Sequence, residues 1–162
     1  MSKIVIFGNS SSGKSTLAKK LAKKNQLAHL DLDSIAWKGG IPAKRLAISE
    51  SRAAINNFLS TNQCWVIEGC YSDLLELVTP KSDEIIFLNL PTADCVANSK
   101  TRPWEPHKYA SKKAQDANLE MLIDWISQYT TRNDTFSKVA HVRLFEEFTG
   151  KKTMYESKEH LT

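Results

Sequence analysis

The segment with the most specific chemistry lies near the N-terminus, where Gly8-Asn9-Ser10-Ser11-Ser12-Gly13-Lys14-Ser15 matches the pattern G-x-x-x-x-G-K-[ST] at every fixed position. It stands between a short apolar run and an amphipathic segment, the strand–loop–helix context that the pattern requires. Glycines let backbone N–H groups turn inward around phosphates, and the start of the helix adds partial positive charge. Lys14 would neutralise phosphate oxygens, and Ser15 would ligate Mg²⁺. We therefore expect ATP and Mg²⁺ to bind along residues 8–16, from Gly8 to Thr16.

Carboxylates stand at the ends of two further predicted strands. Asp31 and Asp33 follow a strand at 27–30, and Glu68, with Gly69, ends a strand at 65–67. Because the carboxyl ends of parallel strands meet at one edge of a sheet, these groups should converge beside the phosphate-binding loop. One carboxylate can align and partly deprotonate an acceptor hydroxyl, while another holds water around Mg²⁺. We assign the first role to Asp33 and place Asp31 at the metal.

Each of these residues also has a plainer interpretation. Asp33 could cap the following turn while Asp31 lies on the surface. Glu68 could orient metal-bound water, or it could simply be a polar strand end. Trp37, shortly after the carboxylates, is either a packing residue or an apolar wall for the acceptor.

Two arginines fall on the apolar stripe of a helix that we expect Pro42 to open, a stripe that includes Ile48 and Ile55. From that stripe Arg45 and Arg52 could reach into the cleft and clamp an anionic acceptor bidentately. Alternatively, both side chains extend past the core into water.

A second basic group lies in a proline-broken segment before the longest predicted helix. A cationic flap there would stabilise charge on the transferring phosphoryl group and exclude water. We expect Arg102 to cover the γ-phosphate, with Arg132 at the end of the long helix as a further catalytic cation. The basic residues of the segment are Arg102, His107, Lys108, Lys112 and Lys113.

The elements that must position these residues alternate between strands and helices. Apolar runs predict strands at 4–7, 27–30, 65–67 and 85–88, and an alternating segment predicts a fifth at 139–145. Helical spacing predicts helices that end near residue 25, run from 92 to about 99, and span about 111–131, while 149–162 is a terminal segment of uncertain order. This alternation favours an α/β domain with a central parallel sheet wrapped by helices.

Length and composition limit the class of protein. The chain has 162 residues, of which 41% are hydrophobic and 25% charged, with a formal charge of +4. We expect one domain over residues 1–162, and the composition excludes a disordered or coiled-coil chain. Cys64, Cys70 and Cys95 lack the close pairs of zinc or redox motifs. With no signal-peptide core and no apolar run near the ~18 residues of a membrane span, we expect a soluble cytoplasmic protein.

The order of these motifs resembles the small P-loop kinases of the adenylate, shikimate and gluconate kinase group. The resemblance implies a three-layer P-loop NTPase fold whose five-stranded parallel sheet has the order 2-3-1-4-5. It also implies an acceptor-binding region at about 33–62 and a small lid at about 100–113. Asp31-Leu32-Asp33 looks like the Asp-x-Asp of shikimate-type kinases, whose second Asp holds the acceptor hydroxyl and whose first sits near Mg²⁺. Arg45 would correspond roughly to their carboxylate-binding arginine.

A closer resemblance is to the adenylate-kinase-like proteins called DNA topology modulation or FlaR-related proteins. The name of that family implies a role in DNA topology, and the similarity implies a nucleotide-binding kinase fold with an open choice of acceptor. The segments that carry it are His29-Leu30-Asp31 with Trp37, Trp65 to Tyr71, Ile86 to Pro91, and Asp124-Trp125-Ile126 with Tyr129 and Arg132.

Departures from the group's patterns narrow the acceptor. Adenylate kinases carry Asp-Gly-Phe-Pro-Arg where this chain has Glu68-Gly69-Cys70-Tyr71-Ser72, which argues against a nucleoside monophosphate. Shikimate kinases have three glycines at that site and this chain has one, which argues against shikimate. The sequence therefore predicts an ATP- and Mg²⁺-dependent phosphotransferase for a small hydroxylated, anionic acceptor. The alternative is a nucleotide-binding regulatory protein that interacts with DNA or a protein partner, in which a lysine face could touch the DNA phosphates; this face is formed by Lys19, Lys20, Lys23 and Lys24.

Overall fold

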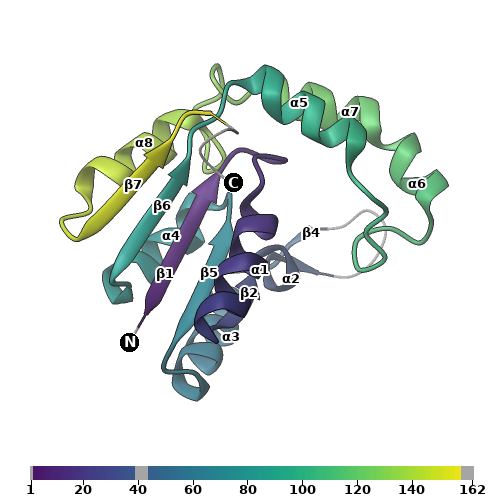
Figure 1. Cartoon of the computed structure of the whole chain (residues 1–162). Helices are drawn as coiled ribbons and strands as arrows, with labels where there is room; N and C mark the ends of the chain where they lie inside the picture. Colours follow the sequence, from purple (N-terminus) through teal and green to yellow (C-terminus); the bar gives the residue numbers. More distant parts are fainter. Residues whose placement is uncertain (1, 39–43, 158–162) are drawn as a thin grey trace.

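A parallel β-sheet forms the centre of the computed structural model, which describes residues 2–38 and 44–157 (Figure 1). Its strand order is β2 (Ala28–Asp31), β5 (Trp65–Gly69), β1 (Lys3–Gly8), β6 (Glu84–Leu88) and β7 (Lys151–Tyr155), and every neighbouring pair is parallel. The expected α/β class and the expected order 2-3-1-4-5 are confirmed.

The central strands are apolar along their whole length because helices cover both faces of the sheet (Figure 1). Val5 and Phe7 belong to a core shared with α3 (Ile48–Thr61), α4 (Ser72–Val78) and α8 (Lys138–Glu147). Ile4 and Ile6 point to the other face, where Ala18 of α1 (Lys14–Asn25) packs against them. A short 3-10 turn, η1 (Thr79–Lys81), leads into β6. This packing fixes the strand ends that carry the candidate site.

The expected fifth strand at 139–145 is wrong, because this segment is helix α8. His141, Leu144 and Phe145 lie at helical spacing and face the core, whereas Val139 is 56% exposed. Ser137 caps the helix by accepting a hydrogen bond from the backbone N–H of Ala140. The fifth strand is β7, in the segment whose order the sequence left uncertain, and it adds to the sheet edge through backbone pairing with β6.

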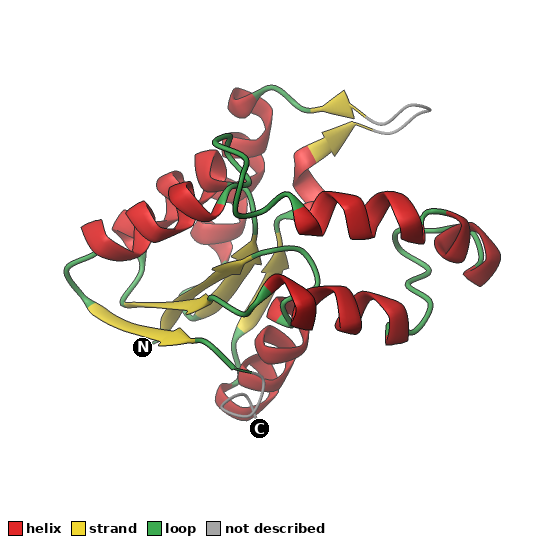
Figure 2. Ribbon diagram, turned by 90° about the horizontal axis from the view of Figure 1, so that it is seen from above, coloured by secondary structure: helices red, strands yellow, loops and turns green. Residues whose placement is uncertain are grey.

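The long helix expected at 111–131 is also divided, into α6 (Lys112–Ala117) and α7 (Leu119–Ser127), with Asn118 between them. The helix expected from residue 92 is confirmed as α5 (Thr92–Thr101), which packs against α7. Seen from above, these helices extend beyond the sheet and form the arm that carries the lid segment (Figure 2). Within the described parts of the chain, no helix is long and apolar enough to cross a bilayer.

The acceptor-side region departs from the expected single helix. After β2 come α2 (Asp33–Ala36) and an antiparallel pair, β3 (Trp37–Lys38) and β4 (Lys44–Arg45), before α3 begins at Ile48. The expected start at Pro42 lies outside the described residues. Arg45 pairs with Trp37 across the β3–β4 ladder, so its extended backbone excludes it from the helix on which we placed it. Arg52 does lie on α3, but on its exposed face.

A fully buried histidine links α8 to the site edge of the sheet. The His141 Nε2–H donates to the carbonyl oxygen of Cys70 at 2.8 Å, and Nδ1 accepts from the Tyr129 hydroxyl at 2.7 Å. Both bonds suit the neutral ring, and burial lowers the pKa of His141 to about 4 from its ordinary value of 6.5. Between about pH 4 and pH 6.5, His141 is therefore protonated in the unfolded chain and neutral in the folded chain.

We expect acid to destabilise the fold through this residue. The contribution of neutral His141 is complete above pH 6.5 and is lost as the pH falls toward about 4, at a total cost of about 3 kcal/mol. Urea unfolding at about pH 7 and about pH 4.5 measures the effect. His141→Gln, which keeps a donor for Cys70, should show a smaller fall in unfolding free energy than the natural chain. An equal fall in both proteins would contradict this assignment.

Candidate functional site

The phosphate-binding loop joins β1 to α1 at the carboxyl edge of the sheet. Gly13 has φ 96°, a left-handed conformation that favours glycine, directly before the first residue of α1. A Cβ on Gly8 would lie 2.6 Å from the carbonyl oxygen of Leu88, so the loop leaves β1 only because Gly8 has no side chain. The spacing of the two glycines therefore shapes the loop as the motif predicted.

Inside this loop the polar groups face inward. The Lys14 Nζ donates to the carbonyl oxygen of Asn9 at 2.7 Å, which folds the lysine over its own loop. The Asn9 side chain is anchored in turn to the carbonyl oxygen of Ile126 on α7 at 3.2 Å. The Ser12 hydroxyl is buried and has no hydrogen-bond partner among the described residues. A buried hydroxyl without a partner, beside a lysine and a helix N-terminus, fits a phosphate oxygen.

Two carboxylates lie next to each other beside the loop, because Asp31 and Glu68 are in register across β2 and β5. Glu68 is almost fully buried and its Oε2 lies 2.9 Å from the Nε2 of His29. Burial raises the pKa of Asp31, and the charges of Glu68 and Asp33 raise it further. Such a crowded pair of carboxylates would be stabilised by a cation.

The residues of this site could hold Mg²⁺ together with the phosphates of a bound nucleotide. No three His, Cys, Asp or Glu side chains within the described ranges are arranged to hold a metal by themselves. Mg²⁺ is usually held by one or two carboxylates together with substrate phosphates. Asp31 and the hydroxyl of Ser15 line the same cavity and supply oxygen ligands of this kind.

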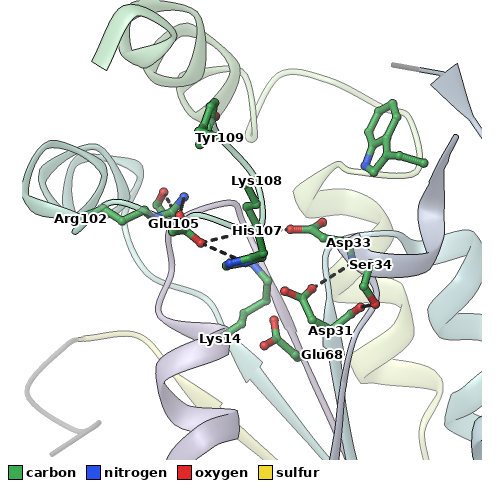
Figure 3. A network of polar contacts seen from close by, with 12 residues as sticks. Lys14, Asp31, Asp33, Ser34, Glu68, Arg102, Glu105, His107, Lys108 and Tyr109 are labelled. Carbon is green, nitrogen blue, oxygen red and sulfur yellow. Dashed lines mark hydrogen bonds and ion pairs between the residues drawn. The ribbon is translucent and has the colours of Figure 1, made fainter. Parts of the chain in front are cut away.

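Asp33 lies at the acceptor end of the same edge, near Lys108 (Figure 3), and two side chains contact its carboxylate. The Lys108 Nζ lies 2.8 Å from its Oδ2, and the Tyr71 hydroxyl donates to its Oδ1. The Trp37 Nε1–H donates to the same Tyr71 hydroxyl at 2.8 Å. Burial pushes the pKa of Asp33 up, but the charge and hydrogen bond of Lys108 outweigh it and hold the pKa below 3.8. Asp33 is therefore an ionised carboxylate at neutral pH.

The lid segment connects the phosphate-binding loop to Asp33 (Figure 3). One end of the Arg102 guanidinium donates to the Ser11 hydroxyl at 2.9 Å, and the other lies 2.9 Å from Oε1 of Glu105. The Glu105 Oε2 then lies 3.4 Å from the Nζ of Lys108, which reaches Asp33. Groups that would hold the phosphates are thus linked through charged contacts to the group that would hold the acceptor.

Lys108→Met should raise the pKa of Asp33. Without the ammonium, burial is the dominant effect on this carboxyl group, and burial raises the pKa. A titration of ¹³C-labelled aspartate side chains followed by NMR measures the change. Lys112→Met is the matched control, since Lys112 pairs with exposed Asp116 and should leave Asp33 unchanged. The same Asp33 titration in the natural chain and in Lys108→Met would mean that the ion pair is absent in solution.

A single cavity of about 600 Å³ brings most of the predicted site residues together. Its lining from the sequence-predicted set is Ser10, Ser11, Ser12, Gly13, Lys14, Ser15, Thr16, Asp31, Asp33, Trp37, Glu68, Gly69 and Arg102. Three predicted arginines, Arg45, Arg52 and Arg132, do not line it. The nucleotide end and the acceptor end therefore share one space.

The remaining arginines have other partners. Arg45 pairs with Asp73 at 3.1 Å and lies over the ring of Tyr71, with its Cζ 4.9 Å from the ring centroid. Arg132 stacks on Trp125, with its Cζ 3.5 Å from the ring centroid, and its Nε lies 3.0 Å from Oδ2 of Asp134. Both cations thus stack on aromatic rings that line the cavity, although neither arginine lines it.

Several cavity residues were missed as site residues. The sequence places Tyr71 and Trp125 only within motifs and Lys108 only among five flap cations, and it gives Glu105 and Phe136 no role. Cys70 also lines the cavity, where burial raises the pKa of its thiol to about 12 and keeps it protonated. The aromatic side chains resembled ordinary core residues, and only their position in the fold distinguishes them.

Comparisons with known proteins show the fold. The sequence matches no protein-family model, and no curated protein matches it significantly. A sugar kinase from a Janibacter species superposes with a TM-score of 0.55 at 13% identity, covering 98% of this chain and 88% of that chain. A gluconokinase from Sinorhizobium meliloti superposes with a TM-score of 0.52 at 17% identity, covering 99% of this chain and 85% of that chain. A deoxyadenosine kinase from M. mycoides has a TM-score of 0.49 at 13% identity, covering 95% of this chain and 90% of that chain. The first two comparisons show that this chain shares the overall fold of those two solved structures.

Proposed function

We propose that this chain is a phosphotransferase that moves the γ-phosphoryl group of ATP to a hydroxyl group of a small acceptor. The observation that carries the proposal is the shared cavity, in which Lys14 and Asp33 face the same space and the lid joins them. A protein that only bound a nucleotide would need the loop, but not a carboxylate held ionised at the other end.

The proposed division of labour follows from where each group lies. Lys14, the loop N–H groups and Ser12 would bind the phosphates, and Arg102 would move from Ser11 to the γ-phosphate. Mg²⁺, when bound, would neutralise phosphate charge, held by Ser15 and Asp31. The acceptor oxygen forms a bond to the γ-phosphorus while the bond to the bridging oxygen of ADP breaks.

Asp33 would orient the acceptor hydroxyl and take its proton. Since its pKa is low, it is a weak base for an unreacted alcohol, so the proton would leave late, as the new P–O bond forms. Lys108 would have to release Asp33 before the hydroxyl could bind there. Binding of the phosphates offers a reason for this release, because Glu105 loses Arg102 when Arg102 turns to the nucleotide.

The expected anionic charge of the acceptor depended on two arginines. We expected an anion because Arg45 and Arg52 were to reach into the cleft. Arg45 is paired with Asp73 and Arg52 is exposed on α3, so neither supports that expectation. The resemblance to FlaR-related proteins stays part of the proposal, resting on the order of the motifs, and so does a cytoplasmic location.

The test is release of ADP from Mg²⁺-ATP, with and without a panel of sugar acids, hydroxy acids, nucleosides and nucleoside monophosphates. Acceptor-stimulated turnover that disappears in Lys14→Ala would establish the phosphotransferase. Binding of ATP without stimulation by any acceptor would overturn it. Duplex DNA is titrated in parallel, because the regulatory alternative predicts binding that weakens steeply with salt.

A further inference from the structure

We propose that the acceptor is a neutral molecule with a flat unsaturated ring next to its reactive hydroxyl, and we take a nucleoside as the representative. This inference rests on the phosphotransferase function proposed above and names its acceptor class. It departs from the anionic acceptor that the sequence suggested.

The first observation is an aromatic wall, which we define as Trp37, Tyr71, Phe136 and Trp125. All four rings line the cavity, and they come from separate parts of the chain. Neighbouring rings meet edge to face, with centroids 6.4 Å apart for Trp37 and Tyr71, 5.3 Å for Tyr71 and Phe136, and 5.2 Å for Phe136 and Trp125. A flat unsaturated ring stacks on such a surface.

The second observation is that Trp37 remains exposed at this cavity. Its ring is 42% exposed although it is a large apolar side chain. Its position is nevertheless fixed, because its Nε1–H is bonded to the Tyr71 hydroxyl. A rigid, exposed aromatic face at a cavity is what a ring-bearing ligand needs, since binding then costs little side-chain entropy.

The third observation is the direct connection between this wall and the group that would hold the hydroxyl. The Tyr71 hydroxyl accepts from Trp37 and donates to Asp33. An acceptor whose ring lies on Trp37 therefore has its neighbouring substituent beside Asp33. This arrangement suits an alcohol carried close to a ring, as in the sugar of a nucleoside.

The fourth observation is the charge balance at the acceptor end. Among the described residues that line the acceptor end of the cavity, the carboxylates are Asp33 and Glu105, and the cation is Lys108. Lys108 is already shared by Asp33 and Glu105. Lys14 and Arg102 lie at the phosphate end. An anionic acceptor would meet a surplus of negative charge, so a neutral one is favoured.

An amino alcohol is the main rival, since a cation would also suit carboxylates and aromatic rings. The wall already carries cations of its own, because Arg45 lies over Tyr71 and Arg132 over Trp125. Each arginine already occupies one face of its ring, so fewer ring faces are left for a ligand cation. The test therefore includes an amino alcohol as a separate arm.

Calorimetric titration into the natural chain is the closing experiment, with Mg²⁺ and a saturating non-hydrolysable ATP analogue that occupies the nucleotide end. The ligands are a purine nucleoside, a pyrimidine nucleoside, the corresponding monophosphates, D-gluconate and choline. We expect a nucleoside to bind, and Trp37→Leu to weaken its binding about tenfold. Trp37→Phe is the matched variant, because it keeps a flat ring at this position and should retain more of the nucleoside binding than Trp37→Leu does.

The outcomes separate this inference from the proposed function. Nucleoside binding that Trp37→Leu weakens, without any turnover, would support the aromatic site and overturn the phosphotransferase. Turnover with gluconate or choline, but not with a nucleoside, would overturn the aromatic acceptor and leave the phosphotransferase standing. Equal losses of nucleoside binding in Trp37→Leu and Trp37→Phe would also overturn the aromatic site.

Discussion

Lys14→Ala should reduce the rate of phosphoryl transfer from ATP by about a thousandfold, a loss expected when a preorganised positive group is removed from the transferring charge. The side chain contacts only the Asn9 carbonyl oxygen among the hydrogen bonds of the loop, so its removal leaves α1 and the sheet intact. The measurement is kcat for ADP release with the acceptor that stimulates it, together with the Kd for ATP.

Lys23→Ala is the control for this prediction, since it removes the same charge from an exposed position in the last turn of the same helix. It should leave kcat within about twofold, because an exposed charge far from the loop is screened. If Lys14→Ala and Lys23→Ala had the same rate as the natural chain, the measured ATP consumption would come from another site or a contaminant.

The sequence was a reliable guide where a single local rule decided the structure. The continuous apolar runs of β1, β5 and β6 required burial on both faces, and that requirement implied helices between parallel strands. The two glycines of the loop allow the tight backbone turn that the motif predicts. The register of β2 with β5 places Asp31 beside Glu68. The phosphate end of the site could therefore be predicted from short segments.

Where the prediction failed, long-range packing decided the structure. The segment 139–145 alternates in polarity, but His141 is buried as a hydrogen-bonded neutral ring, which a polarity pattern counts as polar. β7 carries Lys151 and Lys152 because it is an edge strand held by backbone bonds, so it lacks the apolar signal of the others. No local sequence pattern indicated the β3–β4 pairing, so the helical spacing of Arg45 favoured a helix instead.

The acceptor end shows the same limit more strongly. Lys108 and Asp33 are far apart in the sequence, and only the arm formed by α5, α6 and α7 brings them to 2.8 Å (Figures 1 and 3). The aromatic wall likewise combines residues from β3, from the start of α4 and from the segment around α7. Neither arrangement follows from the order of the motifs, and both bear directly on which acceptor can bind.

Asp33→Asn should lower kcat for the stimulating acceptor by a factor of about 10² to 10⁴, the range that a positioned proton acceptor contributes. The amide keeps the size of the side chain and can still accept from Tyr71, but it cannot take a proton and no longer attracts Lys108. The KM for ATP should change little, since the carboxylate lies at the opposite end of the cavity from the loop. The measurement is a full rate profile against both substrates.

Asp116→Asn provides the matched control, because it removes a carboxylate from exposed α6 in the same arm and should leave kcat unchanged. The pH dependence adds a second criterion. Since the pKa of Asp33 lies below 3.8, its carboxylate stays ionised as the pH falls from about 8 to about 5, and the natural chain should lose no rate through it in that range. A rate that survives Asp33→Asn, with a raised KM for the acceptor alone, would make Asp33 a binding group and assign the proton to solvent.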